Sequence, residues 1–127
     1  MIDPTAWQRH QEGMALKLVL IGAGQRGMIY SSSASRRAEI VAVADVIPGK
    51  AQQFVEAVQL TGAAAYDGHK LLLEQDLDAV SICTPNVSHH VTTVDSLRAG
   101  KQVLLEKPMS VTFQEALEMT KAARETG

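Results

Sequence analysis

The feature that most constrains the fold of this 127-residue chain is an apolar run that ends in a glycine-rich turn. Residues 16–21 have the sequence LKLVLI, and residues 22–27 follow directly with GAGQRG. A buried strand that breaks into G-x-G-x-x-G and continues as a helix is typical of phosphate-binding turns. Gly22 permits the tight turn, Gly24 lets the backbone approach a pyrophosphate, and Gly27 lets the helix pack against the strand. We therefore expect the amino end of this helix, with its free N–H groups and positive dipole, to bind an anion.

A second apolar run supports this interpretation. Residues 40–44 (IVAVA) lead into Asp45, which lies 18 residues after Gly27. A carboxylate after the second strand accepts hydrogen bonds from the adenosine ribose hydroxyls, and it repels the 2′-phosphate that distinguishes NADP from NAD. The spacing therefore predicts a dinucleotide site with NAD as the cofactor.

Two alternatives stay open at this carboxylate. Asp45 also suits a role in which it caps the turn before Pro48 and binds no ligand. The cations Arg26, Arg36 and Arg37 are close enough in sequence to approach a 2′-phosphate, so NADP is the alternative cofactor.

The composition favours one globular domain in the cytoplasm. Hydrophobic residues make up 46% of the chain and charged residues 20%, which at this length suits one core and not two ordinary domains. The formal net charge of -2 gives no general attraction to nucleic acid or to anionic membranes. Cys83 is the single cysteine, so an intrachain disulfide is excluded, and no run resembles a signal peptide or a membrane span. We assign residues 15–127 to the domain and residues 1–14 to an extension, for which three origins stay open: it is natural, left from expression, or the result of a start codon assigned too early.

Apolar runs alternate with segments of helical periodicity, which predicts repeated strand–helix units. Such units form an α/β fold, here a Rossmann-type doubly wound sheet of parallel strands with helices on both faces. The expected strands are residues 16–21, 40–45, 63–66, 79–83 and 102–106. The expected helices are residues 26–35, 48–59, 69–74, 88–99 and 113–124.

Residue types at the helix ends support these limits. Pro48 suits the first turn of a helix, and Gly100 suits the position after a helix end. Thr112 and Glu115 have the spacing of a capping box. The last helix carries an apolar stripe that we assign to core packing. Its members are Phe113, Ala116, Leu117, Met119 and Thr120.

A third group of polar residues follows the strand expected at residues 79–83. Ligands of parallel sheets bind beyond the carboxyl ends of the strands, so Thr84 and Pro85 belong to the same edge as the glycine turn. Pro85 restricts the backbone, and Asn86 or Ser88 caps the next helix. This segment is expected to form a rigid wall of the cofactor site.

Two adjacent histidines, His89 and His90, begin the helix expected at residues 88–99. Their side chains point to different faces of the helix. Two interpretations stay open. One of the histidines contacts a ligand, or both pack against the protein or face solvent, which is more common for a histidine at a helix start. No further His, Cys or carboxylate has the spacing of a metal site, so no metal is expected.

Four motifs occur in one order along the chain: GAGQRG at residues 22–27, TPNVSH at 84–89, AGK at 99–101 and VLLEKP at 103–108. Together they resemble the glucose-fructose oxidoreductase, inositol dehydrogenase and MocA (Gfo/Idh/MocA) family, over nearly all of residues 17–127. The resemblance implies an NAD- or NADP-dependent oxidoreductase. Such enzymes usually transfer hydride between the nicotinamide and a sugar, a polyol or a related carbinol.

The resemblance also gives Lys107 a catalytic role, in which it reaches the nicotinamide ribose side and polarises or deprotonates the substrate hydroxyl. An ammonium group suits this role because it donates to a developing alkoxide. The alternative is a solvated lysine paired with Glu106. The sequence leaves open whether the Lys107–Pro108 bond is cis. The candidate cofactor-binding residues are Gly22, Gly24, Gln25, Arg26, Gly27, Asp45, Thr84, Pro85, Asn86, His89, Glu106 and Lys107.

The resembled family has a second domain, which supplies most of the contacts to the substrate and has no counterpart in these 127 residues. We therefore expect a cofactor half that is incomplete for catalysis alone, with an apolar surface covered by self-association or by the missing substrate domain. Two other classes stay open. They are a stand-alone dinucleotide-binding or partner-interaction module, and a Rossmann fold that has lost its ligand.

Overall fold

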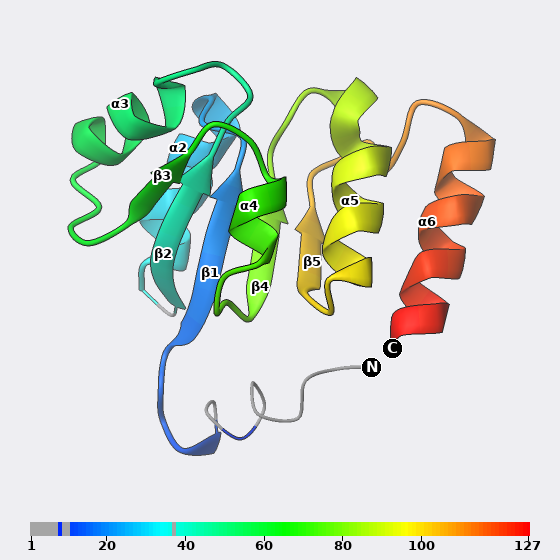
Figure 1. Ribbon diagram of the computed structural model, residues 1–127, viewed down its shortest axis with the longest axis horizontal. Helices are drawn as coiled ribbons and strands as arrows, with labels where there is room; N and C mark the ends of the chain where they lie inside the picture. Colours follow the sequence, from blue (N-terminus) through cyan, green and yellow to red (C-terminus); the bar gives the residue numbers. More distant parts are fainter. Residues whose placement is uncertain (1–7, 9–10, 37) are drawn as a thin grey trace.

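The computed structural model describes residue 8, residues 11–36 and residues 38–127. Within these residues, five strands form one parallel sheet in the order β3-β2-β1-β4-β5 (Figure 1). This order places β1 at the centre and lets the chain wind outward in both directions, which confirms the predicted Rossmann-type arrangement. The strands are β1 (Leu16–Ile21), β2 (Ala38–Ala44), β3 (Ala64–Tyr66), β4 (Ala79–Ile82) and β5 (Gln102–Leu105).

Each expected helix is present, with its ends within two residues of the prediction. The helices that follow β1 are α2 (Gln25–Ala34), α3 (Lys50–Ala57), α4 (Lys70–Leu73), α5 (His89–Arg98) and α6 (Phe113–Thr126), with a 3-10 turn η1 (Asn86–Ser88) before α5. The prediction that Pro48 lies in the first turn of α3 is wrong. Gly49 precedes the helix with a φ of 76°, a conformation that glycine adopts without a Cβ clash, and Lys50 is the first helical residue.

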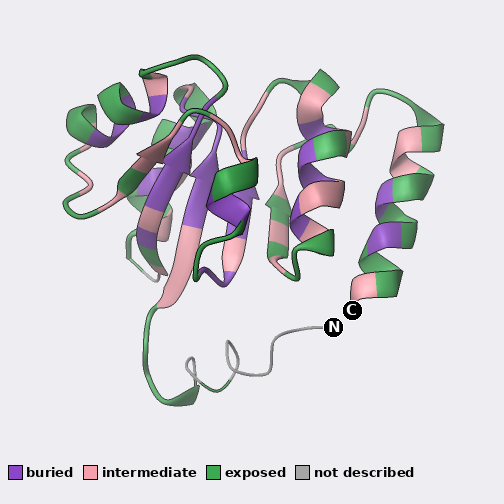
Figure 2. Ribbon diagram, in the orientation of Figure 1, coloured by how far each residue is buried: buried purple, intermediate pink, exposed green. Residues whose placement is uncertain are grey.

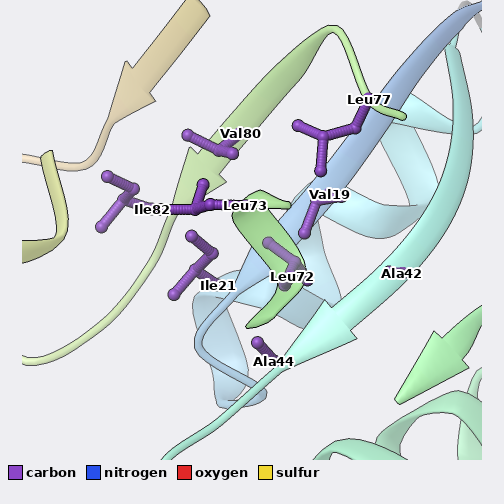
Figure 3. Close-up of a cluster of buried hydrophobic side chains, with 9 residues drawn as sticks. All are labelled: Val19, Ile21, Ala42, Ala44, Leu72, Leu73, Leu77, Val80 and Ile82. Carbon is purple, nitrogen blue, oxygen red and sulfur yellow. The ribbon is translucent and has the colours of Figure 1, made fainter. Parts of the chain in front are cut away.

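Apolar side chains cover both faces of the sheet. Figure 3 shows the cluster beneath α4, where Leu72, Leu73 and Leu77 pack on three strands. The strand residues of this cluster are Val19, Ile21, Ala42, Ala44, Val80 and Ile82. Their neighbours Leu20 and Val43 point to the opposite face and pack with Ala51, Phe54 and Val55 of α3. Burial of both faces explains why β1 and β2 are nearly continuous apolar runs in the sequence.

The predicted signals at the helix ends have different outcomes. Gly100 follows α5 with a φ of 77°, and Thr112 and Glu115 form the expected capping box, so both of these predictions are confirmed. The prediction that the side chain of Asn86 or Ser88 caps α5 is wrong. No side chain caps this helix, and the Ser88 hydroxyl instead donates to the backbone carbonyl three residues earlier, at 2.9 Å. The 3-10 turn η1 leads the chain into α5.

The predicted core stripe of α6 is wrong for Phe113, Leu117 and Thr120, which are exposed. Phe113 is 79% exposed and Leu117 is 47% exposed, whereas Met119 and Ala122 are buried. The reason is visible in Figure 1: α6 lies beyond β5, next to α5 and not over the centre of the sheet. A contact of 2.8 Å between His90 Nε2 and Glu118 Oε2 joins the two helices. Most of α6 is therefore exposed (Figure 2).

Candidate functional site

A cavity of about 740 Å³ opens at the carboxyl ends of β1, β2 and β4. Its volume lies in the range of about 300–1,000 Å³ that small-molecule and cofactor sites occupy. The cavity brings together the glycine turn, the residues after β2 and the residues after β4. The predicted site residues that line it are Gly22, Gly24, Gln25, Arg26, Asp45, Thr84 and Pro85.

The three glycines of the turn have different surroundings. Gly22 has a φ of 103°, and a Cβ atom there would lie 2.6 Å from the carbonyl oxygen of Cys83. A Cβ on Gly27 would lie 2.5 Å from the carbonyl oxygen of Gly22. A Cβ on Gly24 would meet no atom within 4 Å. Gly22 and Gly27 are thus required by the neighbouring backbone, whereas Gly24 leaves open space beside the amino end of α2.

The amino end of α2 faces this space. Gly24 is its N-cap residue, and no side chain caps the helix there. The first N–H groups of a helix have no partner within the helix, so they are available to an anion. This arrangement agrees with the phosphate-binding turn that the sequence predicts.

Asp45 follows β2 and connects that strand to the glycine turn. Its Oδ2 atom accepts a hydrogen bond of 2.9 Å from the backbone N–H of Ala23, and its Oδ1 atom accepts one of 2.9 Å from the N–H of Ile47. Lys50 Nζ lies 3.5 Å from Oδ2. The side chain is 8% exposed and borders the cavity. Asp45 therefore organises the turn after β2, and its remaining lone pairs can accept further hydrogen bonds.

Thr84 and His89 form the wall after β4. The Thr84 hydroxyl oxygen is buried and has no hydrogen-bond partner among the residues that the structure describes. His89 is fully buried behind this wall. Its Nε2 atom lies 3.0 Å from the carbonyl oxygen of Thr84, and its Nδ1 atom lies 2.7 Å from that of Pro108. His89 therefore joins the segment after β4 to the segment after β5.

Glu106 connects the segment after β5 to α2. Its carboxylate accepts hydrogen bonds from the Tyr30 hydroxyl at 2.9 Å and from the backbone N–H of Lys107 at 2.8 Å. Arg26 Nε lies 3.8 Å from the same carboxylate. The hydrogen bonds from Lys107 N–H and Tyr30 lower the pKa of Glu106, and the bond to Glu106 raises the pKa of Tyr30. Burial raises the pKa of the Cys83 thiol, which lines the cavity nearby.

The comparison with protein families decides the relationship. Residues 16–127 match the model of the Gfo/Idh/MocA family, described as an oxidoreductase family with an NAD-binding Rossmann fold. The chain belongs to this family. The recognition based on four ordered motifs is thereby confirmed.

Several family members are similar to this chain over most of its length. An inositol 2-dehydrogenase of Pseudomonas syringae pv. syringae is 35% identical over 104 residues, which are 80% of this chain and 31% of the relative. A D-glucoside 3-dehydrogenase of Escherichia coli is 36% identical over 116 residues, 88% of this chain and 32% of the relative. The chain thus spans about a third of the length of the curated relatives it matches.

Solved structures give the same result. The WlbA dehydrogenase from Chromobacterium violaceum, in complex with NADH and UDP-GlcNAcA, matches with a TM-score of 0.79 and 30% identity over 88% of this chain and 33% of that one. KijD10 from Actinomadura kijaniata, a 3-ketoreductase in complex with NADP and TDP-benzene, matches with a TM-score of 0.77 and 30% identity over 88% of this chain and 35% of that one. Proteins similar to this chain therefore bind either cofactor.

The remaining predicted site residues of this family member lie outside the lining of the main cavity. They are Gly27, Asn86, His89, Glu106 and Lys107. Glu106 and Lys107 instead border a second hollow of about 480 Å³ between α5, β5 and α6. Lys107 is exposed, and its bond to Pro108 is cis. Glu106 stays linked to the main cavity through Arg26, which lines it.

Three polar residues of the cavity wall, Lys50, His69 and Thr92, were not predicted from the sequence. Lys50 lies beside Asp45, and His69 Nε2 forms a 2.8 Å contact with Asp95 Oδ2 between the start of α4 and α5. The signal for Lys50 was a cation five positions after the carboxylate, at the start of the next helix. Arg36, considered for a 2′-phosphate, borders a hollow at the amino ends of β1 and β2, at the opposite edge of the sheet. Arg37 lies outside the described residues.

Residues 8, 11–36 and 38–127 lack two kinds of feature. No group of three or more His, Cys, Asp or Glu side chains there has an arrangement that could bind a metal ion. No helix in that part is long and apolar enough to cross a membrane.

Proposed function

We propose that residues 15–127 bind NAD in the cavity at the carboxyl ends of β1, β2 and β4, as the cofactor unit of an oxidoreductase. Hydride transfer would run between the nicotinamide and a sugar, a polyol or a related carbinol, the class that the names of the relatives indicate. The observation that carries this proposal is the 2.9 Å hydrogen bond from Ala23 N–H to Asp45 Oδ2. It joins the glycine turn and the carboxylate after β2 at one cavity, which supports a site where the turn would bind the pyrophosphate and the carboxylate the ribose of one dinucleotide.

The residues of the cavity suit the parts of NAD. The pyrophosphate would occupy the open space at Gly24. There the uncapped amino end of α2 would donate N–H groups to it, and Arg26 would add a positive charge. The buried carboxylate of Asp45 would accept hydrogen bonds from the hydroxyls of the adenosine ribose. Thr84 has a hydroxyl that lacks a partner within the described residues, and a bound ligand or an ordered water is the usual partner of such a group.

Lys107 is the residue that we propose for proton transfer. Bound NAD supplies the hydride acceptor, and the Lys107 side chain polarises or deprotonates the hydroxyl of the carbinol. Its backbone is fixed on two sides, because Glu106 accepts its N–H and His89 contacts the carbonyl of Pro108. Glu106 and His89 would thus act as positioning residues for Lys107, and Glu106 would contact the cofactor site through Arg26.

Calorimetric titration of the chain with NADH and NADPH tests the proposal directly. A second measurement uses Cys83, the single cysteine of the chain, which lines the cavity. Because the thiolate is the reactive form and burial raises its pKa, labelling with a thiol reagent is best followed above neutral pH. We expect NADH to slow the labelling of the folded chain and to leave the rate in urea unchanged. Absence of both binding heat and protection would favour a Rossmann fold without a ligand.

A second candidate function is a partner-interaction module. The segment before α6 and the exposed side of α6 carry several apolar side chains in a row, which is unusual for a surface without a partner. They are Met109, Val111, Phe113 and Leu117, between 44% and 79% exposed. Sedimentation analysis tests self-association through this surface, with Phe113→Asp as the disrupting variant. A strict monomer at all concentrations would contradict it.

A further inference from the structure

A histidine–carboxylate pair borders the cavity on the side of the segment after β3. His69 is the N-cap residue of α4 and lines the cavity, and its Nε2 atom lies 2.8 Å from Asp95 Oδ2 on α5. We propose that His69, oriented by Asp95, hydrogen-bonds the exocyclic group of the purine base of a bound dinucleotide and so selects adenine over hypoxanthine. The inference rests on the proposed cofactor site and names a residue that gives this site its base specificity.

The order of the strands places His69 where the base would lie. β1, β2 and β3 are neighbours in the sheet, and the segment that follows each of them lines the cavity (Figure 1). In the proposed site, the turn after β1 would bind the pyrophosphate, and Asp45 after β2 would bind the adenosine ribose. Gly68 and His69 follow β3, the next strand outward, so the base attached to that ribose would reach them.

Two pairs of apolar side chains make this end of the cavity suitable for an aromatic ring. Val46 and Ile47 follow β2, and Val87 and Val91 lie in η1 and α5, after β4. All four line the cavity and are between 53% and 79% exposed, so they offer apolar surface to a ligand. Apolar contacts of this kind suit both purines. Discrimination between the two bases requires a polar group at the edge of the ring, which His69 supplies.

The backbone next to His69 is attached to the segment after β2. The carbonyl of Tyr66 accepts a hydrogen bond of 3.1 Å from Asp45 N–H, and Asp67 Oδ1 accepts one of 3.0 Å from Gly49 N–H. These two bonds hold the segment after β3 against the residue proposed for the ribose. The imidazole of His69 therefore extends from a backbone with a fixed position relative to Asp45.

Asp95 determines which ring nitrogen of His69 carries the proton. An ionised carboxylate only accepts hydrogen bonds, so Nε2 donates to Asp95 Oδ2 in both the neutral and the charged form of the ring. The His69 side chain is 14% exposed, and its Nδ1 atom forms no hydrogen bond with the residues that the structure describes. Nδ1 is therefore an acceptor when the ring is neutral and a donor when the ring is protonated.

The two purines differ at the group that would meet Nδ1. Adenine carries an amino group, which donates to a neutral Nδ1, whereas hypoxanthine carries an oxo group, which only accepts. A neutral His69 therefore favours adenine, because the oxo group would face a lone pair. A protonated His69 donates from Nδ1 and favours the oxo group instead. The preference for adenine should thus weaken as the pH falls.

The other charged groups around His69 keep their charge over the range in which a histidine titrates. Aspartate stays ionised, and lysine and arginine stay protonated, between about pH 5.5 and about pH 7.5. The charged residues of the cavity lining and of the segments joined to His69 are Arg26, Asp45, Lys50, Asp67, Lys70 and Asp95. A change of pH in this range therefore alters the charge of His69 and not that of these neighbours.

Calorimetric titration with NAD and with deamino-NAD, in which hypoxanthine replaces adenine, tests the inference at about pH 7.5 and about pH 5.5. We expect the wild type to bind NAD about tenfold more tightly than deamino-NAD at the higher pH, and this ratio to fall below about threefold at the lower pH. His69→Phe keeps a planar ring without a nitrogen, so its ratio should stay below about threefold at both pH values. Asp95→Asn should also lower the ratio at the higher pH, because an amide both donates and accepts and no longer fixes the proton on Nε2.

His90→Gln is the matched control. His90 Nε2 also lies 2.8 Å from a carboxylate oxygen, that of Glu118, but neither residue lines the cavity. This variant should keep the wild-type ratio at both pH values. The comparison of the two dinucleotides on the wild type needs no variant, so it tests the inference even if His69→Phe fails to fold.

The results separate two failures. If the wild type binds neither dinucleotide, the proposed function itself is wrong, and the inference is wrong with it. If the wild type binds both with equal affinity at the higher pH, or if the ratio does not change with pH or in His69→Phe, only the assignment of His69 is overturned.

Discussion

Asp45 and Glu106 each follow directly after a parallel strand, at the same edge of one sheet, and each accepts two hydrogen bonds beside a cation. Their donors differ. Asp45 receives two backbone N–H groups, one of them from the glycine turn. Glu106 receives the N–H of the next residue and the side-chain hydroxyl of Tyr30 on α2. We call Asp45 with its two donors the Asp45 corner, and Glu106 with its two donors the Glu106 corner. The donors of the Asp45 corner are all main-chain groups, whereas the Glu106 corner depends in part on a side chain.

This difference predicts unequal tolerance to substitution. A backbone donor cannot move away when its acceptor is removed, so a buried N–H stays without a partner and the full desolvation penalty remains. A tyrosine hydroxyl near the surface can rotate toward water. The Asp45 corner should therefore be rigid and costly to change, and the Glu106 corner should be adaptable.

The largest effect is expected at the glycine turn that supports the Asp45 corner. In Gly22→Ala, a Cβ would lie 2.6 Å from the Cys83 carbonyl oxygen on a residue with a φ of 103°, so we expect a loss of about 3 kcal/mol or more in the free energy of unfolding. Gly24→Ala is the matched control, because its Cβ meets no atom within 4 Å. This control should fold with little loss of stability and bind NADH more weakly. Urea denaturation and NADH titration of both variants check these outcomes, and equal stability of the two would contradict the comparison.

The next effect is expected from the carboxylate itself. Asp45→Ala removes the acceptor of the Ala23 and Ile47 N–H groups, which should lower the free energy of unfolding by about 2 kcal/mol and weaken NADH binding about tenfold or more. Thermal denaturation and calorimetry measure the two changes. Unchanged NADH affinity would show that Asp45 only caps the turn after β2.

A smaller effect is expected at the Glu106 corner. Tyr30→Phe removes one of the hydrogen bonds to Glu106 and leaves the Lys107 N–H bond in place. The melting temperature should fall less than in Asp45→Ala, because no buried backbone group loses its partner. A fall as large as that of Asp45→Ala would show that both corners are equally rigid.

The smallest effect depends on pH. The pKa of Glu106 lies below its ordinary value of 4.5, mainly because Lys107 N–H donates to it, so the ionised carboxylate stabilises the fold above the unfolded-state pKa. This contribution is lost as the pH falls through the lower, folded-state pKa. The difference in unfolding free energy between wild type and Glu106→Gln should thus be constant above about pH 5 and shrink toward pH 3. Urea denaturation across this range is the measurement, and parallel curves for the two proteins would argue against the assigned role of Glu106.

The sequence allowed most of the elements to be predicted, and also the edge of the sheet that carries the cavity, since both depend on local patterns. The runs that became β1 and β2 are apolar because both faces of these strands are buried. The positions of His89 and Phe113 could not be predicted in this way. Helical periodicity shows which face of a helix is apolar, but not whether another element covers that face.

The sequence by itself determined the order of strands and helices, the glycine turn, the carboxylate after β2 and the family of this chain. The tertiary structure decided which predicted residues meet in one cavity. It placed Lys50 beside Asp45 and Glu106 beside Tyr30 and Arg26. It also buried both ring nitrogens of His89 against carbonyl oxygens. These contacts join residues that are far apart in sequence, or depend on how long side chains extend from their helices. They arise because the sheet brings distant strand ends to one edge, which no local pattern encodes.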